Sequence, residues 1–205
     1  MKAVVMAGGE GTRLRPLTTR RPKPLTPVLN RPVMEYILMS LRDAGITEII
    51  LTVHYMADAI EGSLGDGSDL GLKLTYSVED TPLGTAGSVK KAQEYLMDGA
   101  FLIVSGDALT DVRLADAIEF HRTHHADATL TLAHVPNPLE FGIVVTEPDG
   151  RIRRFLEKPS WGEVFSDTVN TGMYVLNPEV LSYIERGRKT DWSKDDYPRM
   201  QLKGD

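Results

Sequence analysis

A basic, glycine-rich segment near the start of the chain has the composition of a phosphate-binding loop. Positions 8–18 read Gly-Gly-Glu-Gly-Thr-Arg-Leu-Arg-Pro-Leu-Thr, and a Pro-Lys-Pro triplet follows at 22–24. Glycines allow positive φ and let backbone N–H groups turn toward an anion. Arg13 offers phosphate oxygens a planar fork, and Lys23, held between two prolines, offers a point charge on a stiff backbone. We therefore predict phosphate chemistry, with Arg13 and Lys23 as its catalytic cations.

The segment matches neither of two common glycine-rich nucleotide motifs. It lacks the Gly-Lys-Ser or Gly-Lys-Thr of a Walker A loop, and Leu14 stands where a dinucleotide fingerprint needs its last glycine. The glycines by themselves would fit a tight turn between a strand and a helix. Arg13 and Lys23 are the residues that favour a functional interpretation.

Acidic and basic residues also end two apolar runs farther along the chain. Asp107 follows the run 101–105, where a carboxylate can hold Mg²⁺ over phosphates. Glu157 and Lys158 close the run 152–157. Each motif alone also fits a structural role, because aspartate is common in turns and an exposed Glu–Lys pair contributes little stability.

Strands and helices that alternate along the chain must position these residues. The expected strands cover 2–6, 48–53, 72–78, 101–105, 128–135, 142–146, 152–157 and 170–176, and the expected helices cover 32–44, 85–96 and 114–125. This order predicts an α/β fold with a Rossmann-like, mostly parallel mixed sheet flanked by helices, and a smaller β-rich part in the C-terminal third. Since ligands bind at the carboxyl ends of strands in such sheets, the loops 8–24, 80–87 and 105–111 should share one site.

The composition is that of an ordinary folded domain. The 205 residues are 41% hydrophobic and 25% charged, which excludes disordered and fibrous classes and suits one domain. The chain has no cysteine, so a disulfide scaffold, a thiolate metal site and a cysteine nucleophile are excluded. The apolar run at 3–6 is too short for a signal peptide or a membrane span, and the net charge of −6 argues against nucleic acid as a partner. We expect a cytoplasmic protein with neither a membrane nor a nucleic-acid partner.

Taken together, the motifs resemble the signature of the sugar-phosphate nucleotidyltransferases. The resemblance begins with 8–18 and 22–24 and spans nearly the whole chain. It continues through Gly84-Thr85-Ala86, Gly106-Asp107, Phe141-Gly142-Ile143-Val144, Glu157-Lys158-Pro159 and Asn170-Thr171-Gly172. Within the family, the strings at 79–87 and 137–144 look most like those of mannose-1-phosphate guanylyltransferases.

The resemblance implies transfer of a nucleotidyl group from GTP to mannose 1-phosphate, giving GDP-mannose and pyrophosphate, with Mg²⁺ as cofactor. It implies that Arg13 and Lys23 act on the phosphates, that Asp107 is a metal ligand, and it leaves the nearby Asp111 without a role. The implied nucleotide-binding residues are Ala7, Gly8, Gly9, Gly11, Thr12, Glu79, Leu83, Gly84, Thr85 and Ala86. The implied sugar-phosphate-binding residues are Gly142, Glu157, Lys158 and Asn170.

Guanine is favoured over the other bases by the chemistry of Glu79. Guanine has two adjacent donors on its Watson–Crick edge, and one carboxylate can accept both, whereas an amide would suit thymine or uracil better. Glu79 equally fits an exposed acid at a strand end. Two other functions stay open: uridylyl or thymidylyl transfer to glucose 1-phosphate, and a non-catalytic regulatory domain that binds nucleotide sugars.

The resemblance also bears on domain organisation. We expect residues 1–205 to form a single nucleotidyltransferase domain, with a nucleotide-binding part at about 1–125 and a sugar-binding part at about 126–205. Relatives usually continue past the position of Asp205 with a strand and a second metal-binding aspartate, for which this chain has no match, so the C-terminal end of the family domain is expected to be missing. Additional C-terminal domains in the natural chain and a homo-oligomer are both compatible with the resemblance.

Overall fold

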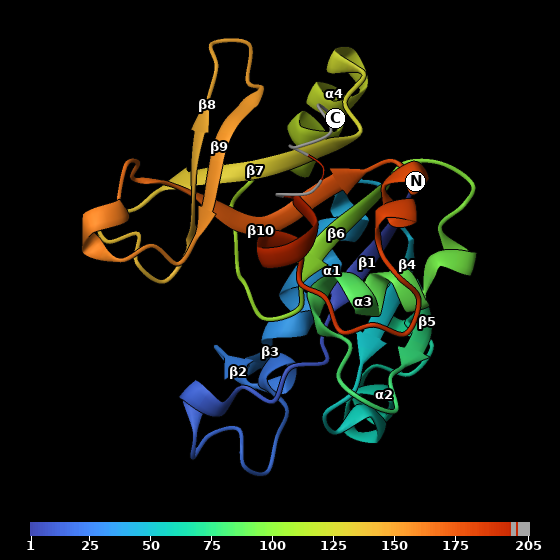
Figure 1. The fold of residues 1–205 in the computed structure, drawn as a ribbon. Helices are drawn as coiled ribbons and strands as arrows, with labels where there is room; N and C mark the ends of the chain where they lie inside the picture. Colours follow the sequence, from blue (N-terminus) through green and yellow to red (C-terminus); the bar gives the residue numbers. More distant parts are fainter. Residues whose placement is uncertain (198–199, 201–205) are drawn as a thin grey trace.

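Four apolar runs, three of them rich in β-branched residues, form the parallel half of an eight-stranded sheet in the computed structural model, which describes residues 1–197 and 200 (Figure 1). The strands are β5 (Lys73–Val78), β4 (Glu48–Val53), β1 (Lys2–Met6) and β6 (Phe101–Ser105), and they pair in that order. All three pairings are parallel. The carboxyl ends of these strands therefore lie along one edge of the sheet.

The later strands extend this sheet in antiparallel fashion. Strand β10 (Thr168–Leu176) pairs with β6, with β7 (Ala128–His134) and with β8 (Gly142–Thr146). Strand β9 (Ile152–Glu157) completes the sheet as a hairpin with β8, which projects from the rest of the sheet in Figure 1. The expected mixed sheet with a β-rich C-terminal third is confirmed, and both parts share one sheet through the β6–β10 pairing.

Helices cover both faces of the sheet, because successive residues of the central strands point to opposite sides. Ala3 and Val5 of β1 belong to one core cluster and Val4 to another. The first cluster is covered by α1 (Val33–Asp43), α2 (Ala57–Leu64) and α4 (Leu114–His124). The second is covered by α3 (Gly84–Lys91) and by the C-terminal segment that contains Trp192.

Two short features were not predicted from the sequence. Helix α2 has only eight residues and begins after Met56, whose φ is +52°, so it offers little periodicity to detect. A small hairpin joins β2 (Pro27–Val28) to β3 (Arg31–Pro32). The predicted helix 85–96 was too long: it ends at Lys91, and a tighter 3₁₀ turn at Gln93–Tyr95 follows.

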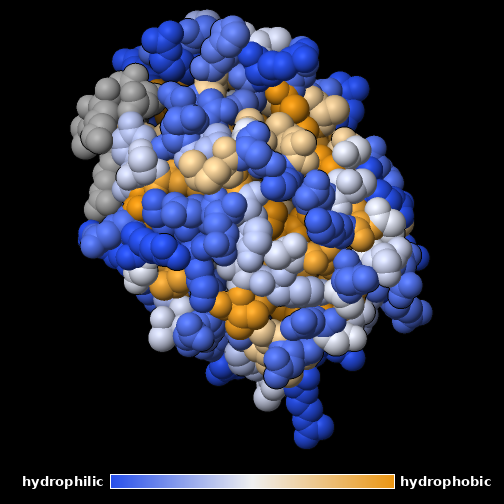
Figure 2. All heavy atoms as spheres, turned by 90° about the vertical axis from the view of Figure 1, so that its right-hand side faces the viewer, coloured by the Kyte–Doolittle hydropathy of each residue, from blue (hydrophilic) through white to orange (hydrophobic). Residues whose placement is uncertain are grey.

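The surface shows hydrophobic and hydrophilic atoms interspersed on the face drawn in Figure 2. Within residues 1–197 and 200, no helix is both long and apolar enough to span a bilayer. The predicted loss of the C-terminal end of the family domain concerns the chain around Asp205, which lies outside the described residues.

Candidate active site

The glycine-rich loop leaves the middle of the sheet and is tied to the strands on either side of β1. The N–H of Ala7 donates to the carbonyl oxygen of Thr52 at 2.8 Å, and the N–H of Gly106 donates to that of Met6 at 2.8 Å. Gly11 has a φ of +62°, which favours glycine, and a Cβ there would lie 3.0–3.1 Å from the side chains of Thr18 and Lys23. Gly11 therefore lets the loop fold back onto the segment that carries Lys23.

A polar cavity of about 210 Å³ lies between this loop and the end of β6. It is lined by Met6, Ala7, Gly9, Gly11, Thr12, Arg13, Leu14, Lys23, Pro24 and Asp107. The structure thus brings together the predicted phosphate-binding loop, Lys23 and the predicted metal ligand Asp107.

Lys23 and Asp107 form the closest charge pair at this cavity. Lys23 Nζ donates to Asp107 Oδ2 at 2.5 Å, and Ser105 Oγ donates to Asp107 Oδ1 at 2.6 Å. About a third of each charged side chain is exposed, so the pair faces the cavity. Arg13 also lines the cavity, but its side chain is 83% exposed and its guanidinium lies 3.9 Å from Glu140 Oε2.

Asp107 presents a single carboxylate to a metal ion. Among the described residues there is no group of three or more His, Cys, Asp or Glu side chains that could hold one. Mg²⁺ usually keeps several waters and takes one or two carboxylates together with substrate phosphates rather than a complete protein cage. Asp107 beside a polar cavity that also contains Lys23 and Arg13 fits that donor set. Asp111, four residues on, is exposed.

Glu79 is not the exposed strand-end acid that the sequence left open. It is only 6% exposed, and its Oε2 accepts the backbone N–H of Leu83 at 2.8 Å. Its Oε1 faces the glycine loop, where a Cβ built on Gly8 would lie 3.4 Å away. Burial raises the pKa of Glu79 despite the bond from Leu83. Oε2 of Glu79 therefore holds the loop at Leu83 in place, and Oε1 is the oxygen that lies next to the glycine-rich loop.

The loop that begins α3 lies against a distant segment at Thr190. Gly84 has a φ of +74°, and a Cβ there would come within 2.4 Å of the carbonyl oxygen of Thr190. The N–H of Ala86 donates to that oxygen at 3.1 Å, and the N–H of Thr190 donates to the carbonyl of Leu83 at 3.0 Å. Thr85 Oγ1 donates to Asp191 Oδ2 at 2.9 Å. Gly84 thus serves a close approach between backbones in addition to any nucleotide contact.

Three of the four predicted sugar-side residues, Gly142, Glu157 and Lys158, lie on the β8–β9 hairpin or directly after it. Gly142 pairs with Glu157, and a Cβ on Gly142 would lie 2.8 Å from Glu157 Oε2, so the missing side chain makes room for the carboxylate. Burial first, and then the negative charge of Asp191, raise the pKa of Glu157. Lys158 Nζ lies 3.9 Å from Glu140 Oε2, the same oxygen that faces Arg13.

Asn170 is engaged by the protein itself. Its Nδ2 donates to Tyr174 Oη at 2.9 Å and to Ser193 Oγ at 3.2 Å, and its Oδ1 accepts the N–H of Gly172 at 3.1 Å. The side chain is buried. A direct contact between Asn170 and a sugar remains a prediction, while its position beside Ser193 is a feature that the sequence did not indicate.

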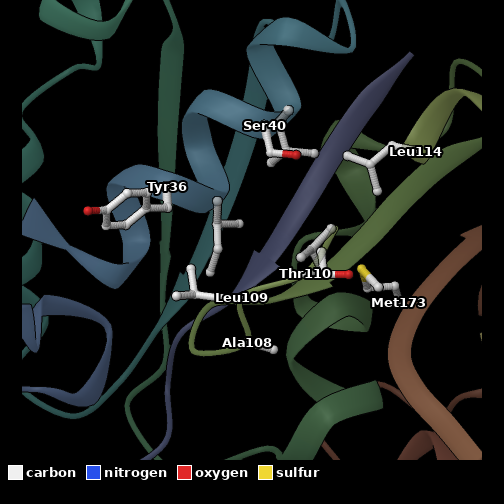
Figure 3. A pocket seen from close by; sticks show the side chains of 10 residues that line it. Tyr36, Ser40, Ala108, Leu109, Thr110, Leu114 and Met173 are labelled. Carbon is white, nitrogen blue, oxygen red and sulfur yellow. The ribbon is translucent and has the colours of Figure 1, made fainter. Parts of the chain in front are cut away.

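A second, apolar hollow lies behind the loop that carries Asp107 (Figure 3). Its lining includes Tyr36 and Ser40 of α1 together with Leu109 and Met173. Its volume is about 40 Å³, much smaller than the 210 Å³ of the polar cavity. It is too small for a nucleotide or a sugar.

Comparisons with known proteins find relatives along nearly the whole chain. The family model described as nucleotidyl transferase matches residues 2–204. The UTP–glucose-1-phosphate uridylyltransferase of Synechocystis is 40% identical over 213 residues, which cover 98% of this chain and 55% of the relative. The mannose-1-phosphate guanylyltransferase of Mycobacterium tuberculosis is 38% identical over 203 residues, which cover 99% of this chain and 56% of the relative. The chain therefore spans little more than half the length of these curated relatives.

Solved structures share the fold over nearly the whole chain. HddC from Yersinia pseudotuberculosis superposes with a TM-score of 0.82 at 26% identity, covering 97% of this chain and 85% of that one. HddC complexed with GMP-PN superposes with a TM-score of 0.80 at 27% identity and the same coverage.

Proposed function

The chain belongs to the nucleotidyl transferase family, and on that premise we propose that it transfers a nucleotidyl group from a nucleoside triphosphate to a sugar 1-phosphate. The observation that carries this proposal is the meeting of the glycine-rich loop, Lys23 and Asp107 around one polar cavity. The backbone of the loop, Arg13 and Lys23 can bind the negative charge of a triphosphate, and the Asp107 carboxylate can hold the metal ion that accompanies it.

The proposed reaction needs no nucleophile from the protein. An oxygen of the sugar 1-phosphate attacks the α-phosphorus in line, a new oxygen–phosphorus bond forms, and the bond to the β-phosphate oxygen breaks to release pyrophosphate. The glycine-rich loop and Arg13 would bind the triphosphate, and Lys23, held in place by Asp107, would neutralise charge on the reacting phosphates. Asp107 would also hold Mg²⁺, which when bound supplies further charge neutralisation.

For the base and sugar we propose guanine and mannose 1-phosphate. Glu79 Oε1 beside Gly8 offers a carboxylate oxygen to a base, relatives named mannose-1-phosphate guanylyltransferase match the chain, and one solved neighbour was crystallised with GMP-PN. The engagement of Glu79 Oε2 with Leu83 and the 40% identity to a uridylyltransferase favour the alternative, transfer from UTP to glucose 1-phosphate.

A matrix of pyrophosphate-release assays tests both levels of the proposal. GTP, UTP and dTTP are each combined with mannose 1-phosphate or glucose 1-phosphate and Mg²⁺. The highest kcat/KM is expected for GTP with mannose 1-phosphate, and a preference for UTP with glucose 1-phosphate would overturn the assigned specificity. Binding of GDP-mannose without release from any pair would contradict catalysis and support a regulatory domain.

A further inference from the structure

Hydrogen bonds join the loop on the nucleotide side to the turn at Trp192–Asp196, and that turn packs against strand β9, which ends in the carboxylate of Glu157. The set of hydrogen bonds begins at Thr85, whose Oγ1 donates to Asp191 Oδ2 at 2.9 Å and accepts the N–H of Trp192 at 3.0 Å. The other oxygen of Asp191, Oδ1, accepts the N–H groups of Ser193 at 3.0 Å and Lys194 at 3.3 Å. In Figure 1 the C-terminal segment, drawn in red, runs alongside α3.

Ser193 continues the connection to the sugar side. Its hydroxyl oxygen accepts from Asn170 Nδ2 at 3.2 Å. The Ser193 side chain also lies near enough to Glu157 to lower the pKa of that carboxyl. A serine hydroxyl can accept and donate at once, so both contacts are compatible. The Glu157 carboxylate in turn lies over Gly142. Hydrogen bonds therefore link Thr85, Asp191, Ser193 and Asn170, and Glu157 lies beside this set.

We propose that Asp191 is a positioning residue that couples the nucleotide-binding loop to the sugar-binding carboxylate Glu157. The inference rests on the proposed function, since it assigns Thr85 to one substrate and Glu157 to the other. Ordering of the loop at Thr85 by a nucleotide fixes Asp191 and, through Ser193, holds Glu157 ready for the sugar.

The residues next to Asp191 in the chain are buried and closely packed. Thr190 and Trp192, its neighbours in the chain, are 3% and 1% exposed. The indole ring of Trp192 stacks on Tyr197 with centroids 5.6 Å apart, and Tyr174 meets Tyr197 edge-on at 5.2 Å. The backbone at Asp191 is thus held on both sides, and its carboxylate joins Thr85 at the start of α3 to the turn at Trp192–Asp196.

A purely structural role for Asp191 would use only part of this geometry. Asp191 caps the turn at Trp192–Asp196 with Oδ1, and that role requires no contact to Thr85. The bond from Thr85 uses the other oxygen. The charge of Asp191 also reaches Glu157: it raises the pKa of Glu157, while Lys158, Lys194 and the hydrogen bond from Ser193 lower it. The carboxylate of Asp191 therefore both accepts a hydrogen bond from Thr85 and raises the pKa of Glu157.

Steady-state kinetics on Asp191→Asn, Thr85→Val and the double variant test the coupling, with nucleoside triphosphate saturating. Loss of a hydrogen bond to a charged group predicts a rise of about tenfold in KM for the sugar 1-phosphate in each single variant, with kcat changed by less than about threefold. The double variant should be no worse than either single variant, because both remove the same link. Asp195→Asn is the matched control: its carboxylate accepts the N–H of Asp191 at 2.8 Å, so it removes the same charge from the same segment.

An unchanged KM for the sugar 1-phosphate in Asp191→Asn, additive effects in the double variant, or an equal rise in Asp195→Asn would overturn the coupling. If the wild-type chain releases no pyrophosphate with any pair, the proposed function fails, and hydrogen exchange tests the coupling separately. Asp191→Asn should then speed amide exchange at both 83–87 and 155–158, and Asp195→Asn should not. Faster exchange confined to 191–197 would refute the link.

Discussion

At the scale of single residues, the pair Lys23–Asp107 sets the electrostatics of the proposed site. The carboxylate of Asp107 holds the Lys23 ammonium at 2.5 Å, and Ser105 holds the other carboxylate oxygen. Both charged groups face the cavity, where incoming phosphates and a metal ion would compete for them. Asp107 thus holds the Lys23 ammonium at the position where we propose that the phosphates bind.

Replacing Lys23 tests whether this cation acts in the reaction. Lys23→Ala should lower kcat/KM for pyrophosphate release by about 10²–10³-fold, a magnitude typical of losing one electrostatic contact to a transition state. Because a third of the Lys23 side chain is exposed, the thermal melt should stay close to that of the wild type. Arg15→Ala serves as the control, since Arg15 pairs with Glu10 in the same loop at 3.4 Å and should retain activity within about threefold. Turnover near the wild-type level in Lys23→Ala would remove Lys23 from the mechanism.

Burial of Glu79 predicts how stability depends on pH. Its pKa in the folded state is raised by burial, so its contribution to stability is full below the pKa of the unfolded chain and is lost as pH rises through the folded-state pKa. Glu79→Gln keeps an acceptor for the Leu83 N–H and removes the titration. The free energy of unfolding of the wild type should therefore fall relative to Glu79→Gln as pH rises from acidic to neutral, as urea denaturation at several pH values can measure. A difference that stays constant or changes in the opposite sense would contradict the raised pKa.

At the scale of elements, the sequence predicted well what is encoded locally. The strands at 2–6, 48–53, 101–105, 142–146 and 152–157 match the structure to the residue, because each is a run of apolar or alternating residues bounded by turns. That the glycine-rich loop, Lys23 and Asp107 lie together could also be predicted, because the loops that carry them follow the carboxyl ends of two parallel strands. Contacts between distant segments could not be predicted in this way. Thr85 and Asp191 are 106 residues apart, and no motif around Asp191 indicates that it bonds to Thr85.

Gly84 at the start of α3 shows how such a distant contact determines a residue type. Gly84→Ala should destabilise the fold by at least about 2 kcal/mol, because a positive φ costs an L-residue about 1–2 kcal/mol and the added Cβ would meet the Thr190 carbonyl. Activity should fall as well, since Thr85 and Asp191 would be pushed apart. Gly62→Ala within α2 is the control, because a Cβ there meets no atom within 4 Å and alanine favours helix. Equal stability of the two variants by chemical denaturation would disprove the close approach at Gly84.

At the scale of the whole molecule, the proposed nucleotide-binding part (about 1–125) and the proposed sugar-binding part (about 126–205) contribute strands to one sheet with a shared core. Strand β10 pairs with β6 from Tyr174↔Ile103 to Leu176↔Phe101. The cluster under α3 contains Val4 and Ile50 from the parallel half together with Leu176 and Trp192 from the later part. A ligand that binds at the glycine-rich loop should therefore stabilise both halves together.

The effect of a bound ligand on unfolding tests whether the two parts of the sheet unfold together. With nucleoside triphosphate and Mg²⁺ at about 100 times the dissociation constant, the free energy of unfolding should rise by about 2.7 kcal/mol in a single transition. Tryptophan fluorescence, dominated in the core by Trp192, and far-UV circular dichroism should report the same midpoint before and after the shift. Trp192 lies on the C-terminal segment, far along the chain from the loop that would hold the phosphates. The unfolding midpoint reported by Trp192 fluorescence should therefore shift with ligand only if the shared core joins the two parts. Two transitions, of which only one shifts with ligand, would show that the proposed nucleotide-binding and sugar-binding parts unfold separately despite the shared sheet.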